Sequence, residues 1–184
     1  MKLAATLVAM LLPFMAAAPS HAADDIVVQS AAAELHDGVL EFTVRAGFPA
    51  DEQTSTALMD GATVDLDVEV TVDLQNRFWR DEQLVEDNFR RELTWNAPSQ
   101  RFVLRDVDSG HQRTFATLEE ALEAAGKVDG WQVPFTQELD PAETYEVSVR
   151  ARLRRGRMPN LLRALTFWTR YWNRSEYYRW ELPR

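Results

Sequence analysis

The chain has 184 residues, of which 46% are hydrophobic, and its 20 basic and 29 acidic residues give a formal charge of −9. It contains no cysteine, which excludes disulfides, thiol catalysis and thiolate metal sites. A core can be sufficient without such cross-links, because a domain of about 150 residues buries roughly 70% of its unfolded surface.

Residues 1–22 have the pattern of a secretory signal peptide. A positive residue, Lys2, precedes an apolar run from Leu3 to Ala18, and small residues lie before the expected cut after Ala22. The apolar run is short for a bilayer span, which disfavours a membrane anchor. We therefore expect cleavage, a periplasmic location and one domain over residues 23–184.

Charge is unevenly distributed along the chain. Residues 150–184 contain ten arginines and two glutamates, a local balance of +8. Without Lys2 the mature chain carries −10, so residues 23–149 carry −18. The sequence thus predicts an acidic body with a basic C-terminal end. An exported protein with such a body is not expected to bind nucleic acid, because its charge repels phosphates.

Two long segments alternate between apolar and polar residues, which predicts strands with one buried and one wet face. The first is Val64–Leu74 and the second is Thr144–Arg154. Shorter strands are predicted at Ile26–Glu34, Val39–Ala46, Phe89–Trp95, Arg101–Asp106, Arg113–Phe115 and Tyr177–Leu182. Turn residues at His36-Asp37-Gly38 and Asp108-Ser109-Gly110 separate several of them.

The polar faces of the two long strands carry opposite charges. One presents Asp65, Asp67, Glu69 and Asp73, and the other presents Arg150, Arg152 and Arg154. If the strands are neighbours, these rows pair across the sheet, each pair contributing roughly 0.2–1 kcal/mol. If they are not, the arginines form a free basic stripe suited to anionic lipids or an acidic partner.

Helices are expected to be few. Thr117 and Glu120 form a capping box, and Gly126 is expected to end that helix as a left-handed cap. A second short helix is predicted from Asp51 to Asp60. The expected fold is an antiparallel β-sandwich of about eight strands, Ig-like or an open-barrel variant, with one or two short helices and a C-terminal amphipathic segment.

No catalytic pattern is found. The mature chain has two histidines, His36 and His111, both in turn-like contexts without metal-ligand spacing. There is neither a nucleophile elbow nor a glycine-rich phosphate loop. We therefore expect a protein that is not an enzyme and that has no metal or cofactor.

Aromatic and basic residues concentrate near the C-terminus. A helical projection of Leu161–Arg174 places Leu165, Trp168 and Trp172 on one face, opposite an arginine face. Such a helix is typical of membrane-interface or partner docking. An ordinary amphipathic helix that closes one end of the sandwich has the same pattern, and this interpretation is favoured. The candidate binding residues are Arg163, Leu165, Phe167, Trp168, Arg170, Tyr171, Trp172 and Arg174.

A secondary candidate follows the first long strand. Arg77, Phe78, Trp79 and Arg80 form either an exposed recognition loop or a strand continuation in which arginines stack on rings; the second interpretation is favoured.

Four motifs recur in order along the mature chain, namely Leu58–Ala62, Arg77–Asp81, Met158-Pro159 and Ser175–Trp180. Together they resemble the proteobacterial exported proteins grouped as domain-of-unknown-function family 4390. The chain departs from that pattern at Phe78 and Tyr177, where tryptophan is usual. The resemblance implies a periplasmic protein without catalytic residues to carry over, and it points to a signalling or envelope role beside a membrane sensor kinase.

These observations favour a non-enzymatic interaction module that docks a membrane protein, such as a sensor kinase, or an anionic membrane surface through its C-terminal Trp/Arg-rich region. The alternative is a carrier of a small apolar ligand or lipid held within the sandwich. The sequence does not fix the oligomeric state.

Overall fold

A computed structural model describes residues 25–75, 81–137, 139–157 and 173–182. Its elements in chain order are β1 (Val27–His36), β2 (Val39–Gly47), α1 (Glu52–Met59), β3 (Val64–Gln75), β4 (Glu82–Asn96), β5 (Arg101–Asp106), β6 (Gln112–Phe115), α2 (Leu118–Ala125), β7 (Lys127–Pro134), β8 (Thr144–Arg155), β9 (Asn173–Arg174) and β10 (Tyr178–Glu181). The expected signal peptide lies outside the described residues.

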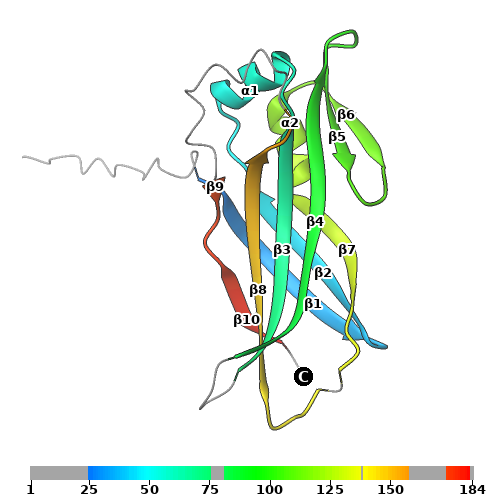
Figure 1. The fold of residues 1–184 in the computed structure, drawn as a ribbon, viewed down its shortest axis with the longest axis vertical. Coiled ribbons are helices and arrows are strands. Elements are labelled where there is room, and N and C mark those ends of the chain that lie inside the picture. The colour runs from blue at the N-terminus through cyan, green and yellow to red at the C-terminus, as the bar shows by residue number, and fades with distance from the viewer. Residues whose placement is uncertain (1–24, 76–80, 138, 158–172, 183–184) are drawn as a thin grey trace, which may run out of the picture.

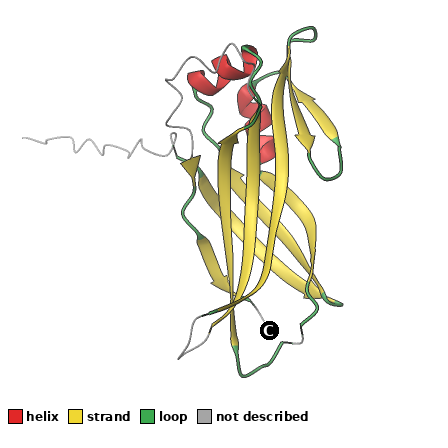
Figure 2. Ribbon diagram, viewed as in Figure 1, coloured by secondary structure: helices red, strands yellow, loops and turns green. Residues whose placement is uncertain are grey.

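The strands form two antiparallel sheets that pack face to face (Figure 1). The smaller sheet has the order β1-β2-β7, and the larger has the order β10-β8-β3-β4-β5-β6, with β9 also paired to β8. The helices lie together near one end of the sheets (Figure 2). This arrangement confirms the predicted antiparallel β-sandwich. No helix among the described residues is long and apolar enough to cross a membrane.

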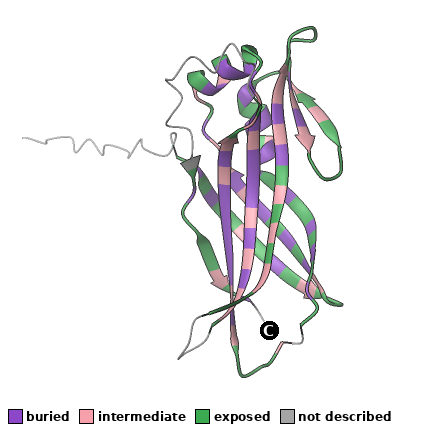
Figure 3. Cartoon of the chain, viewed as in Figure 1, coloured by how far each residue is buried: buried purple, intermediate pink, exposed green. Residues whose placement is uncertain are grey.

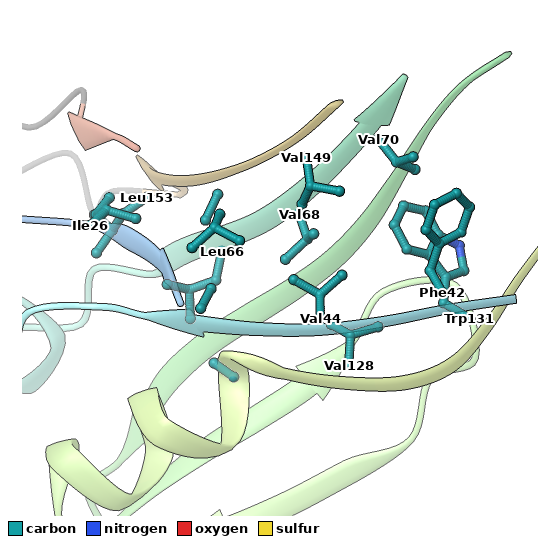
Figure 4. Packing of buried hydrophobic residues seen from close by; sticks show 14 of the residues in the cluster. Ile26, Phe42, Val44, Leu66, Val68, Val70, Val128, Trp131, Val149 and Leu153 are labelled. Atoms are coloured by element: carbon teal, nitrogen blue, oxygen red, sulfur yellow. The ribbon is translucent and has the colours of Figure 1, made fainter. Parts of the chain in front are cut away.

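The hydrophobic core lies between the two sheets. In Figure 4, Phe42 and Val44 of β2 face Val68 and Val149 of β3 and β8. Each of these four residues is at most 2% exposed. Period-2 alternation places these apolar residues on the inner faces, which confirms the inward side of both long predicted strands.

All eight predicted strands are present, but β7 was not predicted. Its apolar residues Val128 and Trp131 are three positions apart, so the sequence shows no alternation there. The pairing with β2 shifts between Phe42 and Val44, and Gly130 within the bulge has φ +65°. A bulge adds one residue to the strand and restores the inward direction of the following side chain. Alternation therefore survives in space and is lost in sequence.

Helix α2 begins as predicted and ends differently. The Thr117 side chain accepts a hydrogen bond from the Glu120 backbone N–H, and Glu120 reaches back to the N–H of Ala116. The expected left-handed cap at Gly126 is wrong, because its φ is −78°. Glycine is needed there for close approach: an added Cβ would lie inside contact distance of the Ala46 carbonyl oxygen and 2.9 Å from its carbon.

Arg91 joins four separate segments from a buried position. Its Nε donates to Asp106 at 2.7 Å, and its Nη1 donates to the carbonyls of Ala125 at 2.7 Å and Lys127 at 2.8 Å. The guanidinium also lies over the Phe89 ring, 4.6 Å from its centroid. Desolvation lowers the pKa of Arg91, and the hydrogen bond that Arg91 donates to Asp106 opposes this shift. The residue thereby attaches the C-terminal end of α2 and the start of β7 to the larger sheet.

Gly126→Ala is expected to destabilise the fold by at least about 2 kcal/mol, because the new methyl group overlaps the rigid β2 backbone. Gly110→Ala is the control, since Gly110 has φ +71° and nothing within 4 Å of an added Cβ, so it incurs only the left-handed strain of roughly 1–2 kcal/mol. Urea unfolding measures both variants. A smaller loss for Gly126→Ala than for Gly110→Ala would contradict the close-approach explanation.

Arg91→Met is expected to lower the free energy of unfolding by about 3 kcal/mol, because it leaves Asp106 and the α2 carbonyls without their buried donor. Arg105→Met is the matched control: its pair with Glu92 is more exposed, and such pairs contribute about 0–1 kcal/mol. Chemical denaturation compares the two variants. Equal losses would show that Arg91 is no more than a surface ion pair.

Candidate functional site

Most of the residues predicted to form the binding site lie outside the described part of the chain. This holds for Arg163, Leu165, Phe167, Trp168, Arg170, Tyr171 and Trp172, and for the secondary set Arg77, Phe78, Trp79 and Arg80. Their predicted role stays a prediction. Arg174 is described: it is exposed and belongs to β9, opposite Arg152. The predicted helix Leu161–Arg174 is therefore wrong at its last two residues, which form a strand along β8.

The two charged rows are neighbours and pair across the sheet. β3 and β8 are adjacent, with Asp65, Asp67 and Glu69 opposite Arg154, Arg152 and Arg150. Arg150 Nη2 donates to Glu69 at 2.7 Å. The other two pairs are diagonal, from Arg152 to Glu69 and from Arg154 to Asp67. Arg150, Arg152 and Arg154 are thus paired with β3, so the alternative in which they form a free basic stripe is wrong.

The outer face of these strands is not wet as predicted. Asp67 is 2% exposed and Arg150 is 8% exposed, and β8 is buried along most of its length (Figure 3). The long arginine side chains lie across the neighbouring strand, so their stems cover what alternation alone would leave in solvent. Tyr177 adds to this cover, because the Arg150 guanidinium is 4.4 Å from its ring centroid.

Burial dominates the electrostatics of this outer face. It raises the pKa of Asp67, a rise that the Arg154 guanidinium opposes, and it raises the pKa of Glu69 against the opposing effect of Arg150. Asp67 Oδ1 and the Nε groups of Arg152 and Arg154 are buried without a hydrogen-bond partner. Such a network fixes register more than it adds stability, since desolvation offsets much of the attraction.

A groove opens at the side of the sandwich where the C-terminal segment meets β1. It has a volume of about 440 Å³. Its lining residues are Asp25, Ile26, Val27, Val28, Arg174, Ser175, Glu176, Tyr177 and Tyr178. We call it the C-terminal groove. Val27, Tyr177 and Tyr178 are 46%, 41% and 37% exposed, and they are three of the five large hydrophobic residues exposed among those described.

A bulge in the edge strand shapes this groove. From Arg174 to Tyr178 the edge advances four residues, while β8 advances three from Arg152 to Val149. Ser175 secures the extra residue: its backbone N–H donates to the Ala151 carbonyl, and its Oγ accepts from the Ala151 N–H at 3.0 Å. The bulge turns Tyr177 toward Arg150 and leaves Tyr178 beside Trp180, with their ring centroids 5.8 Å apart.

Of the residues that line this groove, only Arg174 was among the predicted binding residues, and sequence reasoning missed Val27, Ser175, Tyr177 and Tyr178. Val27 belongs to the apolar run Ile26-Val27-Val28, in which three consecutive apolar residues cannot all point inward from a strand. That exception to alternation was the available signal. Ser175 carries no comparable signal, because its role depends on the Ala151 backbone and not on a pattern.

No group of three or more His, Asp or Glu residues within the described ranges could hold a metal ion. An apolar hollow lined by α1, the start of β3 and the end of β8 has a volume of about 20 Å³, on the scale of one water molecule.

The comparisons with known proteins give a family and no activity. The model of DUF4390, a domain of unknown function, matches residues 23–181. No curated protein and no solved structure matches the chain.

Asp65→Asn is expected to raise stability at pH 7. Burial first, and then the charges of Asp67 and Glu92, raise the pKa of Asp65. A carboxyl with a raised folded-state pKa contributes stability below about pH 4, and this is lost as the pH rises through the folded pKa. Urea midpoints should therefore favour the variant at pH 7 and converge with the parent at pH 3. Glu41→Gln, at an exposed position of β2, is the control and should change neither midpoint. A gain that persists at pH 3 would contradict this electrostatic cause.

Proposed function

We propose from its geometry that this chain, which belongs to the DUF4390 family of unknown function, is a non-enzymatic periplasmic interaction module. Its partner is a membrane protein, and its contact surface is the C-terminal groove. The observation that carries the proposal is the concentration of exposed Val27, Tyr177 and Tyr178 in one hollow. Exposed apolar and aromatic groups that gather on one surface are typical of sites that a partner covers.

The rigid attachment of this groove supports recognition of a protein. Its tyrosines lie on a segment that β8 holds by strand pairing and by Ser175. Arg150 and Arg179 hold the Tyr177 ring, with their guanidinium carbons 4.4 and 4.9 Å from its centroid. Pre-organised aromatic side chains lose little conformational entropy on binding, which is why tyrosine is enriched at protein interfaces.

A membrane surface has less support as the partner. Binding to anionic headgroups would use unpaired basic residues, and the arginine row of β8 is already paired with β3. The sequence-based alternative of an apolar-ligand carrier also has less support. The residues between the sheets are closely packed, and the apolar hollow beside α1 has about 20 Å³, whereas small-molecule sites have about 300–1,000 Å³.

The experiment is co-sedimentation of the purified mature protein with right-side-out membrane vesicles, compared with liposomes made from the lipids of the same membranes. We expect binding to the vesicles and its loss after the vesicles are treated with protease. The double variant Val27→Ser, Tyr178→Ser should weaken binding about tenfold or more, the scale of one or two lost apolar contacts. Trp168→Ala with Trp172→Ala tests the predicted contribution of residues outside the described part.

Met59→Ser with Val107→Ser is the matched control, because it also removes two exposed large hydrophobic residues and lies outside the groove. Vesicle binding should be unchanged in this control. Equal binding to liposomes and vesicles, with strong salt dependence, would replace the protein partner with a lipid surface. Lipid that co-purifies with the protein in stoichiometric amount, seen by mass spectrometry, would instead favour the carrier.

A further inference from the structure

Half of β4 has an unpaired edge among the described strands. β5 pairs with β4 only from Arg91 to Asn96, whereas β3 pairs with β4 from Glu82 to Leu93. The pairing with β3 shifts beside Val85, which is opposite Val72, and is regular from there to Phe89. Val85–Phe89 is therefore a short, regular segment with one free side, which we call the open edge.

The open edge is on the same side of β4 as the backbone groups that pair with β5 from Arg91 to Asn96. In an antiparallel strand, alternate residues direct both their N–H and C=O to the same side. The Arg90 carbonyl accepts the Val107 N–H at 2.9 Å, which shows that its groups point away from β3. Asn88 and Glu86 follow at the same spacing. The Asn88 N–H confirms this direction, because it donates at 2.7 Å to the Asp87 side chain rather than to β3.

A groove of about 470 Å³ lies beside the open edge, toward β7. Phe89 and Trp131 form its aromatic floor, with ring centroids 5.7 Å apart and a near edge-to-face angle of 64°. Asp87, Asn88 and Gln132 also line it. The site therefore combines free strand backbone with an apolar surface for alternate side chains, the two features of recognition by strand addition.

The charge around the open edge selects the occupant. In the groove, Arg90 is neutralised by Asp108 at 2.9 Å, which leaves the Asp87 carboxylate as the net charge. Glu82 and Glu86 lie on the same strand, and the body as a whole carries the −18 of residues 23–149. An incoming acidic strand would be repelled, and a basic one attracted.

We propose that β4 binds a basic, extended segment of a partner protein, which adds as a strand beside Val85–Phe89. Its backbone pairs with Glu86 and Asn88. Its apolar side chains pack on Phe89 and Trp131. One of its basic side chains takes the Asp87 carboxylate, which releases the Asn88 N–H for the incoming strand. This site is independent of the C-terminal groove, since β4 and β7 are on the opposite side of the sandwich from β10 and β1.

The experiment measures fluorescence anisotropy of a labelled peptide composed of lysine and valine with the full mature protein. A peptide with glutamate in place of lysine is the charge control. We expect the basic peptide to bind at least about tenfold more tightly than the acidic one. Binding should slow hydrogen exchange at the amides of Glu86 and Asn88, which marks backbone pairing. No measurable binding of the basic peptide would overturn the proposal.

Two variants separate strand addition from simple charge attraction. Asn88→Pro removes an N–H that faces the open side and keeps the ladder to β3, and Asp87→Lys reverses the local charge. Each should weaken binding of the basic peptide about tenfold. Asp60→Lys makes the same charge change at an exposed site near α1 and should leave binding unchanged. Thermal unfolding checks that each variant is folded.

Three results would overturn the proposal. Asn88→Pro that is folded and binds like the parent would exclude strand pairing. A loss with Asp60→Lys equal to that with Asp87→Lys would reduce the effect to net charge. Self-association that Asn88→Pro abolishes would assign the edge to a second copy of this chain. None of these readouts uses vesicles or the C-terminal groove, so the proposed docking function stands or fails separately.

Discussion

The register between β3 and β8 determines both faces of the larger sheet. Twelve consecutive residue pairs, from Val64 with Arg155 to Gln75 with Thr144, align the valines on the inner face. The same register places carboxylates opposite guanidiniums on the outer face. A shift by one residue would put charges into the core, so the apolar and ionic patterns specify one register together. β10 then pairs with β8, and β4 pairs with β3. Both proposed sites therefore depend on this pair of strands.

The opposite charges of the outer face specify the strand register and do not form an accessible binding surface. Asp67 is nearly inaccessible, and its Oδ1 has no partner although Arg154 pairs with the carboxylate. In a buried network, desolvation offsets most of the attraction between charges, and breaking one pair costs more than forming it gains. The network thus penalises wrong registers strongly. It also pairs three arginines of the basic C-terminal end with carboxylates of β3. These arginines therefore do not neutralise the acidic residues on other parts of the surface.

How much could be predicted from sequence depended on whether a residue's environment is periodic. The long alternations of β3 and β8 were sufficient for strand type, inward face and fold class. The bulge at Gly130 removed the alternation of β7, and the close approach to Ala46 has no local signature, so Gly126 was assigned a left-handed role it does not have. The predicted solvent exposure was also wrong where arginine side chains lie across the neighbouring strand: Arg150 belongs to a polar row and is nonetheless buried.

The candidate sites were less predictable because they arise where the two sheets differ in size. Three strands cover a sheet of seven, so edges of the larger sheet extend beyond their cover. On one side, the bulge at Ser175 and the start of β1 leave Tyr177, Tyr178 and Val27 exposed. On the other side, the pairing between β5 and β4 ends at Arg91, and the residues of β4 that precede Arg91 are left without β5 as a neighbour. Neither opening is encoded in a motif, since each depends on where a neighbouring strand stops. A long free edge invites aggregation, and an acidic edge such as Glu86-Asp87 opposes it by repelling identical copies. The same charge leaves the edge open to a strand of opposite sign, so protection from aggregation and recognition of a basic partner follow from one physical property.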